Sequence, residues 1–230
     1  MENVEPAEKA KGREAVVRRV LVVDDHPIVR EGLSQLIETA ADLTVCGTAS
    51  EAEKVLGRVE ELQPDMVLLD ITLRGGSGLD VCRELSHVYP SIPVLILSMH
   101  NEDVYAERAL RVGAKGYQMK DASPGKLLDA IRRILSGQVH LSEAIHSKVA
   151  RRLRMTGKKN VASEQDRLTD RELEIFEMIG QGLPTRRIAD DLSLSMKTVE
   201  THRANIKRKL QLADANELVH RAVFYMANSG

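Results

Sequence analysis

The chain has 230 residues, of which 29% are charged and 43% hydrophobic, and its formal net charge is −1. This is an ordinary globular composition, and no stretch approaches the ~18 consecutive apolar residues that a membrane span needs. We therefore expect a cytoplasmic protein with no membrane partner. Residues 1–18 carry many charges and no apolar secretion signal, so we predict a disordered tail there. Cys46 and Cys82 each lie in an apolar pattern and are expected to be buried thiols.

Charge is unevenly distributed along the chain. Residues 1–140 contain 17 Lys and Arg against 22 Asp and Glu, a net of −5. Residues 141–230 contain 16 against 12, a net of +4, and the two parts sum to −1. An acidic first part and a basic second part indicate two domains with different partners, and the basic part weakly favours nucleic acid.

Residues 19–138 alternate short apolar runs with segments of helical pattern. The apolar runs cover 19–24, 43–49, 65–70, 92–98 and 116–120, and the helical segments lie near 27–39, 51–62, 79–88, 102–112 and 124–136. The middle runs are apolar throughout, which is typical of parallel strands covered on both faces. We predict an α/β doubly wound domain with a five-stranded parallel sheet. Ser50 with Glu53, and Ser123 before Pro124, are the expected helix starts.

The remainder of the chain is predicted to be a linker followed by helices only. Residues 139–167 form the predicted linker, with an amphipathic helix at about 141–154 and then a polar stretch without hydrophobic period. From 168 to 230 we predict a small all-α domain of four helices. Its start signals are a capping box of Thr169 and Glu172, a proline at 184, and caps at Ser195 and Asp214. A three-residue turn between the second and third helices describes a helix-turn-helix unit.

Chemically useful side chains end four of the predicted strands. They are Asp24, Asp25, Asp70, Ser98 and Lys120. Sites in open parallel sheets form beyond the carboxyl ends of the strands. Three carboxylates suit Mg²⁺, and a lysine with a hydroxyl suits the oxygens of a phosphoryl group that Asp70 would accept. Each residue alone is as well explained by helix capping or an exposed position, but their coincidence in one domain favours a site.

The segments VLVVDDHPIVREGL, MVLLDITLRGGSGLD, VLILSMH and GAKGYQMKD, in this order, resemble the receiver domain of two-component response regulators. The resemblance covers residues 19–138 and implies a flavodoxin-like fold. It implies that Asp70 is the phosphoacceptor. It also implies a Mg²⁺ site in which Asp25 is a direct ligand, Asp24 binds through water, and the backbone carbonyl of Thr72 is the third protein ligand.

The same resemblance gives roles to the later strand ends. Ser98 and Lys120 would contact the phosphoryl oxygens, and Tyr117 would be the aromatic switch that turns inward when Ser98 moves toward the phosphate. The family commonly has Met-Pro where this chain has Leu73 and Arg74 before two glycines, so this loop is expected to be more flexible. His100 and His26 are expected to be surface residues.

The basic helical part resembles the LuxR-type module of the NarL/FixJ subfamily over about 168–225, from LTDRELEIFEMIGQG to SMKTVETHRANIKRKLQL. The resemblance implies base-facing positions at Glu200, Thr201 and Ala204, phosphate contacts at Arg186, Lys197, Thr198 and Lys207, and either role for Arg203. In the third helix, Val199, Ile206 and Leu210 share one face and should pack inward. Leu218, Val219, Ala222 and Val223 in the last helix match a dimerisation face, although packing inside the domain would explain them as well.

Together these resemblances imply a response regulator of the NarL/FixJ subfamily that controls transcription and is not an enzyme. We expect a sensor histidine kinase to phosphorylate Asp70 with Mg²⁺ present. A homodimer, formed when phosphorylated or DNA-bound, would then bind promoter half-sites in double-stranded DNA. One alternative is a metal-dependent phosphohydrolase, disfavoured because Thr72 stands where the haloacid-dehalogenase pattern needs a second Asp. Another is a receiver used only for protein interaction, disfavoured by the complete set of strand-end residues.

Overall fold

The structure is a computed structural model that describes residues 16–143, 145–147 and 167–228. Residues 1–15 of the expected tail and 148–166 of the expected linker lie outside the described residues. Of the helix expected at about 141–154, residues 143 and 145–147 are described and are helical.

The first domain contains a sheet of five parallel strands. They are β1 (Arg18–Val23), β2 (Leu43–Ala49), β3 (Met66–Asp70), β6 (Val94–Ser98) and β7 (Gly116–Met119). Their spatial order is β2-β1-β3-β6-β7, and every neighbouring pair is parallel. This confirms the predicted doubly wound fold. The strand order reverses between β1 and β3, so the carboxyl ends of these two strands border the crevice where such sheets bind ligands.

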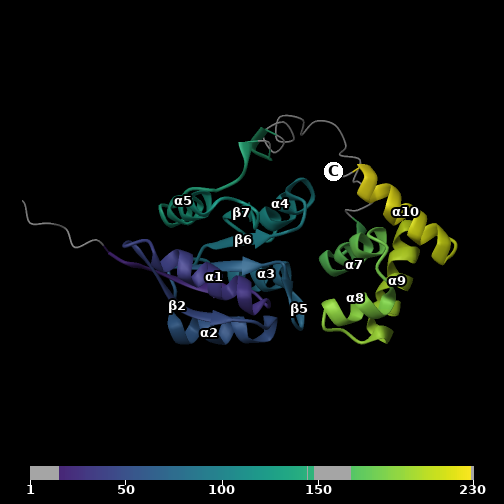
Figure 1. Ribbon diagram of the computed structural model, residues 1–230, viewed down its shortest axis with the longest axis horizontal. Helices are drawn as coiled ribbons and strands as arrows, with labels where there is room; N and C mark the ends of the chain where they lie inside the picture. The colour runs from purple at the N-terminus through teal and green to yellow at the C-terminus, as the bar shows by residue number, and fades with distance from the viewer. Residues whose placement is uncertain (1–15, 144, 148–166, 229–230) are drawn as a thin grey trace, which may run out of the picture.

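Helices cover both faces of this sheet (Figure 1). One face packs against α1 (Pro27–Glu38) and α5 (Pro124–Leu135), and the other packs against α2 (Val55–Leu62), α3 (Gly78–Val88) and α4 (Glu102–Arg111). Successive strand residues point to opposite faces. Val20 and Val22 accordingly lie in the apolar cluster with α1 and α5, whereas Leu21 and Val23 lie in the cluster with the other three helices.

The start of the second helical segment differs from the prediction. A short 3₁₀ helix, η1 (Ala52–Lys54), precedes α2, and its N-cap is Glu51 without a side-chain hydrogen bond. The Ala52 N–H instead donates to the Arg74 carbonyl at 3.0 Å. The predicted capping by Ser50 and Glu53 is therefore wrong, because backbone pairing with the next loop satisfies this end. Ser123 does stand at the N-cap of α5, but its side chain makes no capping hydrogen bond.

The loop after β3 is an ordered hairpin. Strands β4 (Thr72–Leu73) and β5 (Gly76–Ser77) pair antiparallel, and Leu73 is buried. Gly75, in the turn, has φ of 80°, a conformation that glycine adopts without strain. The loop forms a defined turn, which carries Thr72 toward the second domain, and its expected flexibility stays a prediction.

The second domain contains α7 (Asp170–Gly180), α8 (Thr185–Asp191), α9 (Met196–Leu210) and α10 (Ala215–Asn228). Thr169 and Glu172 form both halves of the expected capping box, and Val199, Ile206 and Leu210 are buried as expected. In Figure 1 α7 and α8 lie beside the first domain near β5, at the end where the sheet strands terminate. No helix in the described part of the chain is long and apolar enough to cross a membrane.

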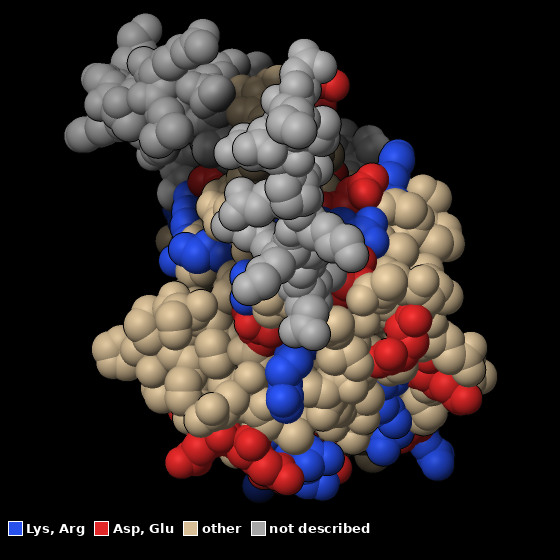
Figure 2. Space-filling model, turned by 90° about the vertical axis from the view of Figure 1, so that its left-hand side faces the viewer, with Lys and Arg blue, Asp and Glu red and all other residues tan. Residues whose placement is uncertain are grey.

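The end of the first domain that faces away from the second domain carries charges of both signs. Figure 2 shows that Lys and Arg lie among Asp and Glu on this end, separated by uncharged residues, and that neither sign gathers into one broad area.

Both cysteines are free thiols, but only Cys82 is buried, and burial raises its pKa to about 12. Cys46 is partly exposed, because β2 is an edge strand.

Candidate functional site

Three carboxylates meet where β1 and β3 end. Asp24 and Asp25 follow β1 directly, and Asp70 is the last residue of β3. Ligand atoms of these three residues and of His26 all lie within 4.8 Å of one another. The carboxylates are 1%, 8% and 4% exposed, respectively. The structure therefore brings together the acidic residues that the sequence placed at separate strand ends.

Lys120 supplies positive charge to this cluster. Its Nζ lies 2.7 Å from an oxygen of Asp70 and 2.7 Å from an oxygen of Asp24. Burial raises the pKa of Asp70 to about 6, against the lowering effect of Lys120. Burial also disfavours the charged lysine, but Asp70 and Asp24 outweigh it and raise the pKa of Lys120. One ammonium thus serves two carboxylates, and the site keeps an excess of negative charge.

The donor set fits a small, oxygen-preferring cation. Asp25 Oδ1 is buried and accepts no aligned hydrogen bond from the described residues, although the His26 ring nitrogen Nδ1 lies 2.7 Å away. Burial is the main cause that raises the pKa of Asp25, and it is opposed by His26. An uncompensated buried carboxylate oxygen is costly, and a bound divalent cation would relieve this cost.

His26 has a larger part in the site than the sequence indicated. Its side chain is 65% exposed, as expected for a surface residue, yet it contacts Asp25 and its backbone N–H donates to Asp24 Oδ1 at 2.8 Å. In the sequence, the only sign of this role was the position of His26 directly after the two aspartates.

Ser98 and Tyr117 lie on the neighbouring strands β6 and β7. Ser98 is fully buried, and its Oγ accepts a hydrogen bond from the His100 N–H at 3.1 Å. Tyr117 is 1% exposed and its hydroxyl donates to the His100 carbonyl at 2.7 Å. Burial raises the pKa of this phenol. The residue expected to act as an aromatic switch thus already lies inward.

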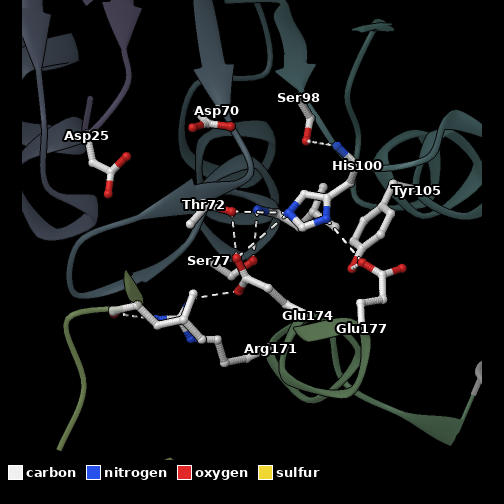
Figure 3. A network of polar contacts seen from close by, with 12 residues as sticks. Asp25, Asp70, Thr72, Ser77, Ser98, His100, Tyr105, Arg171, Glu174 and Glu177 are labelled. Atoms are coloured by element: carbon white, nitrogen blue, oxygen red, sulfur yellow. Dashed lines mark hydrogen bonds and ion pairs between the residues drawn. The ribbon is translucent and has the colours of Figure 1, made fainter. Parts of the chain in front are cut away.

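The site continues into the second domain through Thr72 and His100 (Figure 3). The Thr72 hydroxyl donates to Glu174 Oε1 at 2.5 Å and lies 3.2 Å from His100 Nε2. His100 Nδ1 lies 3.1 Å from Glu177 Oε2, which also accepts from the Tyr105 hydroxyl at 3.1 Å.

The structure corrects the expected surface position of His100, whose side chain is only 20% exposed. Burial lowers the pKa of His100, but Glu177 and Glu174 outweigh this and raise it above its ordinary value. The two glutamates come from α7, and sequence reasoning gave them no role.

The residues expected to contact DNA lie mainly on exposed parts of α8 and α9. Glu200, Thr201 and Ala204 are exposed, and Glu200 Oε1 accepts a hydrogen bond from Thr185 of α8 at 2.9 Å. Of the other expected contacts, Arg186 and Lys197 are exposed and Thr198, Arg203 and Lys207 are partly exposed.

The four residues of the expected dimerisation face divide into two pairs. Leu218 and Ala222 are fully buried against the domain's own core, whereas Val219 and Val223 are 38% and 48% exposed. Only the second pair is available to another molecule.

Comparison with known proteins agrees with this arrangement. Residues 20–132 match the response regulator receiver domain family, and residues 166–222 match the LuxR family of bacterial regulatory proteins. The chain is 36% identical over 193 residues to the nitrate/nitrite response regulator NarL of Escherichia coli K12, covering 84% of this chain and 89% of that protein. The chain belongs to the NarL-type response regulators. Members of this family act as transcription regulators in two-component systems, and the family assignment predicted from the sequence is confirmed.

Two further relatives support this family assignment. The transcriptional regulatory protein LiaR of Bacillus subtilis is 36% identical over 203 residues, with 86% of this chain and 93% of that protein covered. A crystal structure of a LuxR-family two-component response regulator from Aurantimonas sp. SI85-9A1 is 35% identical, with a TM-score of 0.56. It covers 60% of this chain and 98% of that chain.

Proposed function

We propose that Asp70 of this response regulator accepts a phosphoryl group from a sensor histidine kinase. The observation that carries the proposal is the buried Asp70 carboxylate, paired with Lys120 at 2.7 Å beside Asp24 and Asp25. Receiver domains generally bind Mg²⁺ in such an acidic pocket. We propose that Asp24, Asp25, Asp70 and the backbone carbonyl of Thr72 hold it here. Bound there, Mg²⁺ would neutralise charge that develops on the phosphoryl oxygens.

The residues around Asp70 fit the requirements of phosphoryl transfer. An Asp70 oxygen attacks phosphorus, so the new O–P bond forms as the N–P bond of phosphohistidine breaks and its electron pair returns to the imidazole. Lys120 already contacts Asp70 and would follow the new negative charge onto the phosphoryl oxygens. Ser98 would donate its hydroxyl to one of these oxygens. Tyr117 already lies inward, and its hydroxyl donates to the His100 carbonyl. This bond would support the backbone that follows Ser98.

We propose that the helical domain binds double-stranded DNA through the exposed face of α9. Glu200, Thr201 and Ala204 would face base edges in the major groove, because they are exposed within the first nine residues of α9, the second helix of the helix-turn-helix. Arg186, Lys197, Thr198 and Lys207 would contact phosphates, and Arg203 would do either. Val219 and Val223 would join two copies into a homodimer on promoter half-sites, leaving Leu218 and Ala222 in the domain core.

The substitution Asp70→Asn tests the phosphoacceptor. It removes the nucleophilic carboxylate but keeps its shape, so we expect no labelling by a small phosphodonor such as phosphoramidate with Mg²⁺. The label is measured as the mass increase of the intact chain. Circular dichroism should show an unchanged fold. Labelling of Asp70→Asn at the wild-type rate would show that another residue is the acceptor.

A further inference from the structure

Glu200 is the one acidic residue among the three that are proposed to face base edges. Its side chain is 60% exposed, whereas that of Arg203, three residues further along α9, is only 15% exposed. DNA phosphates repel a carboxylate, so an exposed glutamate on a DNA-binding surface must be offset by a specific favourable contact. Two neighbouring side chains indicate what that contact is.

Thr185 holds Glu200 from the side of α8. The Thr185 hydroxyl donates to Glu200 Oε1 at 2.9 Å. Thr185 is the first residue of α8 and shares a helix face with Ile188 and Ala189, three and four residues later, which are buried. The packing of these two residues fixes the helix, and a β-branched side chain has few rotamers. The direction of the Thr185 hydroxyl is therefore well defined.

Arg203 approaches the same carboxylate from within α9. Its Nε lies 3.7 Å from Glu200 Oε1, and the spacing of three residues places both side chains on one helix face. Because the Arg203 side chain is largely covered, its guanidinium is less available to a phosphate than the exposed Lys197. Its positive charge instead offsets the negative charge of Glu200 beside the DNA backbone.

The two contacts leave one oxygen of Glu200 for a base. Both are made to Oε1, and Glu200 Oε2 accepts no hydrogen bond from the described residues. In the major groove cytosine presents its N4 amino donor and no acceptor, adenine presents an amino donor beside the N7 acceptor, and guanine and thymine present acceptors. The carboxylate thus favours cytosine, because each of the other bases would place an acceptor against it.

We propose that Thr185 and Arg203 are positioning residues that aim Glu200 at the N4 amino group of a cytosine in each promoter half-site. The hydroxyl and the guanidinium hold Oε1, and Oε2 accepts from the base. Arg203 then acts in base selection rather than in phosphate binding. This inference deepens the proposed function, and it rests on the exposed face of α9 entering the major groove.

Selection of bound sequences from a randomised pool of double-stranded DNA identifies the base that Glu200 faces. The full-length chain is used at a fixed salt concentration, treated with phosphoramidate and Mg²⁺. For wild type we expect a cytosine at one position of each half-site. Replacing it by thymine should raise the Kd, measured by fluorescence anisotropy, about tenfold, within the range usual for one mismatched base pair. In Glu200→Gln the preferred base should become adenine, because glutamine pairs with its N6 and N7.

Thr185→Val and Arg203→Met test the positioning. Valine keeps the shape of threonine but has no hydroxyl, so the preference for cytosine over thymine should fall about threefold or more. Thr185→Ser is the matched control, since it keeps the hydroxyl and should retain the wild-type preference. Arg203→Met removes the charge but keeps a long side chain, and it should also lower the preference. If Arg203 were instead a phosphate contact, its loss would weaken binding to all sequences equally and reduce the salt dependence.

Lys197→Ala is the control for a phosphate contact. It should raise the Kd for all sequences alike and leave the base preference unchanged. An undiminished preference for cytosine in Thr185→Val or in Arg203→Met would overturn the inference for that residue. A different base at the position that Glu200→Gln alters would overturn the choice of cytosine. DNA binding through α9 would stand in both cases, because Lys197→Ala would still weaken it. If Lys197→Ala and Glu200→Gln changed neither affinity nor preference, the proposed DNA surface would itself be wrong.

Discussion

Asp70 owes its position partly to a residue without a side chain. Gly78 begins α3, and its N–H donates to the Ile71 carbonyl at 2.6 Å. A Cβ atom on Gly78 would lie 1.9 Å from the backbone oxygen of Asp70. Because this neighbour is backbone, no side-chain rotation relieves the clash. The close approach therefore explains why glycine is needed at this position.

We expect Gly78→Ala to destabilise the receiver by about 2 kcal/mol or more, since overpacking a rigid site typically costs ~1–3 kcal/mol. Displacement of Asp70 should also slow its labelling by phosphoramidate. Urea unfolding followed by circular dichroism measures the first effect, and intact mass measures the second. Gly57→Ala is the control, because Gly57 lies in α2 and an added Cβ would meet no atom within 4 Å beyond its chain neighbours and its own helix backbone. Equal stability of the two variants would show that the Gly78 backbone yields at little cost.

The acidic site could be predicted from the sequence, and the contact between the domains could not. Asp24, Asp25 and Asp70 each follow an apolar run, and parallel strands bring such ends together. Glu174 and Glu177 lie on an amphipathic helix, where carboxylates usually face solvent. Their partners are 102 and 77 residues away in the chain. Sequence reasoning has no rule that joins residues across two domains.

At the scale of the element, two of the predicted caps, at Thr169 and at Ser123, gave different results for a physical reason. Thr169 Oγ1 accepts from the Glu172 N–H at 3.3 Å, and Glu172 Oε2 accepts from the Thr169 N–H at 2.8 Å. Ser123 occupies the same position before α5 but makes no side-chain capping bond, and Pro124 at the first helical position has no N–H to satisfy. A sequence pattern identifies the residue at the N-cap, but it does not show whether the side chain of that residue accepts a hydrogen bond from the first turn of the helix.

This difference predicts unequal costs for two similar substitutions. Thr169→Ala should lower the free energy of unfolding of the DNA-binding domain by about 1 kcal/mol, the usual cost of a lost N-cap. Ser123→Ala should change that of the receiver by less than about 0.5 kcal/mol, as expected for a surface substitution. Urea unfolding followed by circular dichroism measures both. A larger loss in Ser123→Ala than in Thr169→Ala would contradict the capping geometry.

At the scale of the whole molecule, docking of α7 leaves the proposed DNA and dimer surfaces exposed. Glu200, Thr201 and Ala204 on α9 face solvent, as do Val219 and Val223 on α10. Control of DNA binding therefore does not require these side chains to be buried by the receiver. We expect DNA binding to be controlled through dimerisation instead, since a symmetric dimer sets the spacing of its two recognition helices.

Val223→Asp tests this pairing. A twofold interface contains each residue twice, so one substitution places two unpaired carboxylates in the contact. In sedimentation experiments with Mg²⁺ and beryllofluoride, which mimics the phosphoryl group on Asp70, wild type should dimerise. The dimer Kd of the variant should be at least about tenfold higher, a difference of ~1.4 kcal/mol. Val88→Asp is the control, because Val88 on α3 of the receiver is equally exposed, at 48%. If Val88→Asp prevents dimerisation and Val223→Asp does not, the two copies associate through their receivers, and α10 has no part in holding them together.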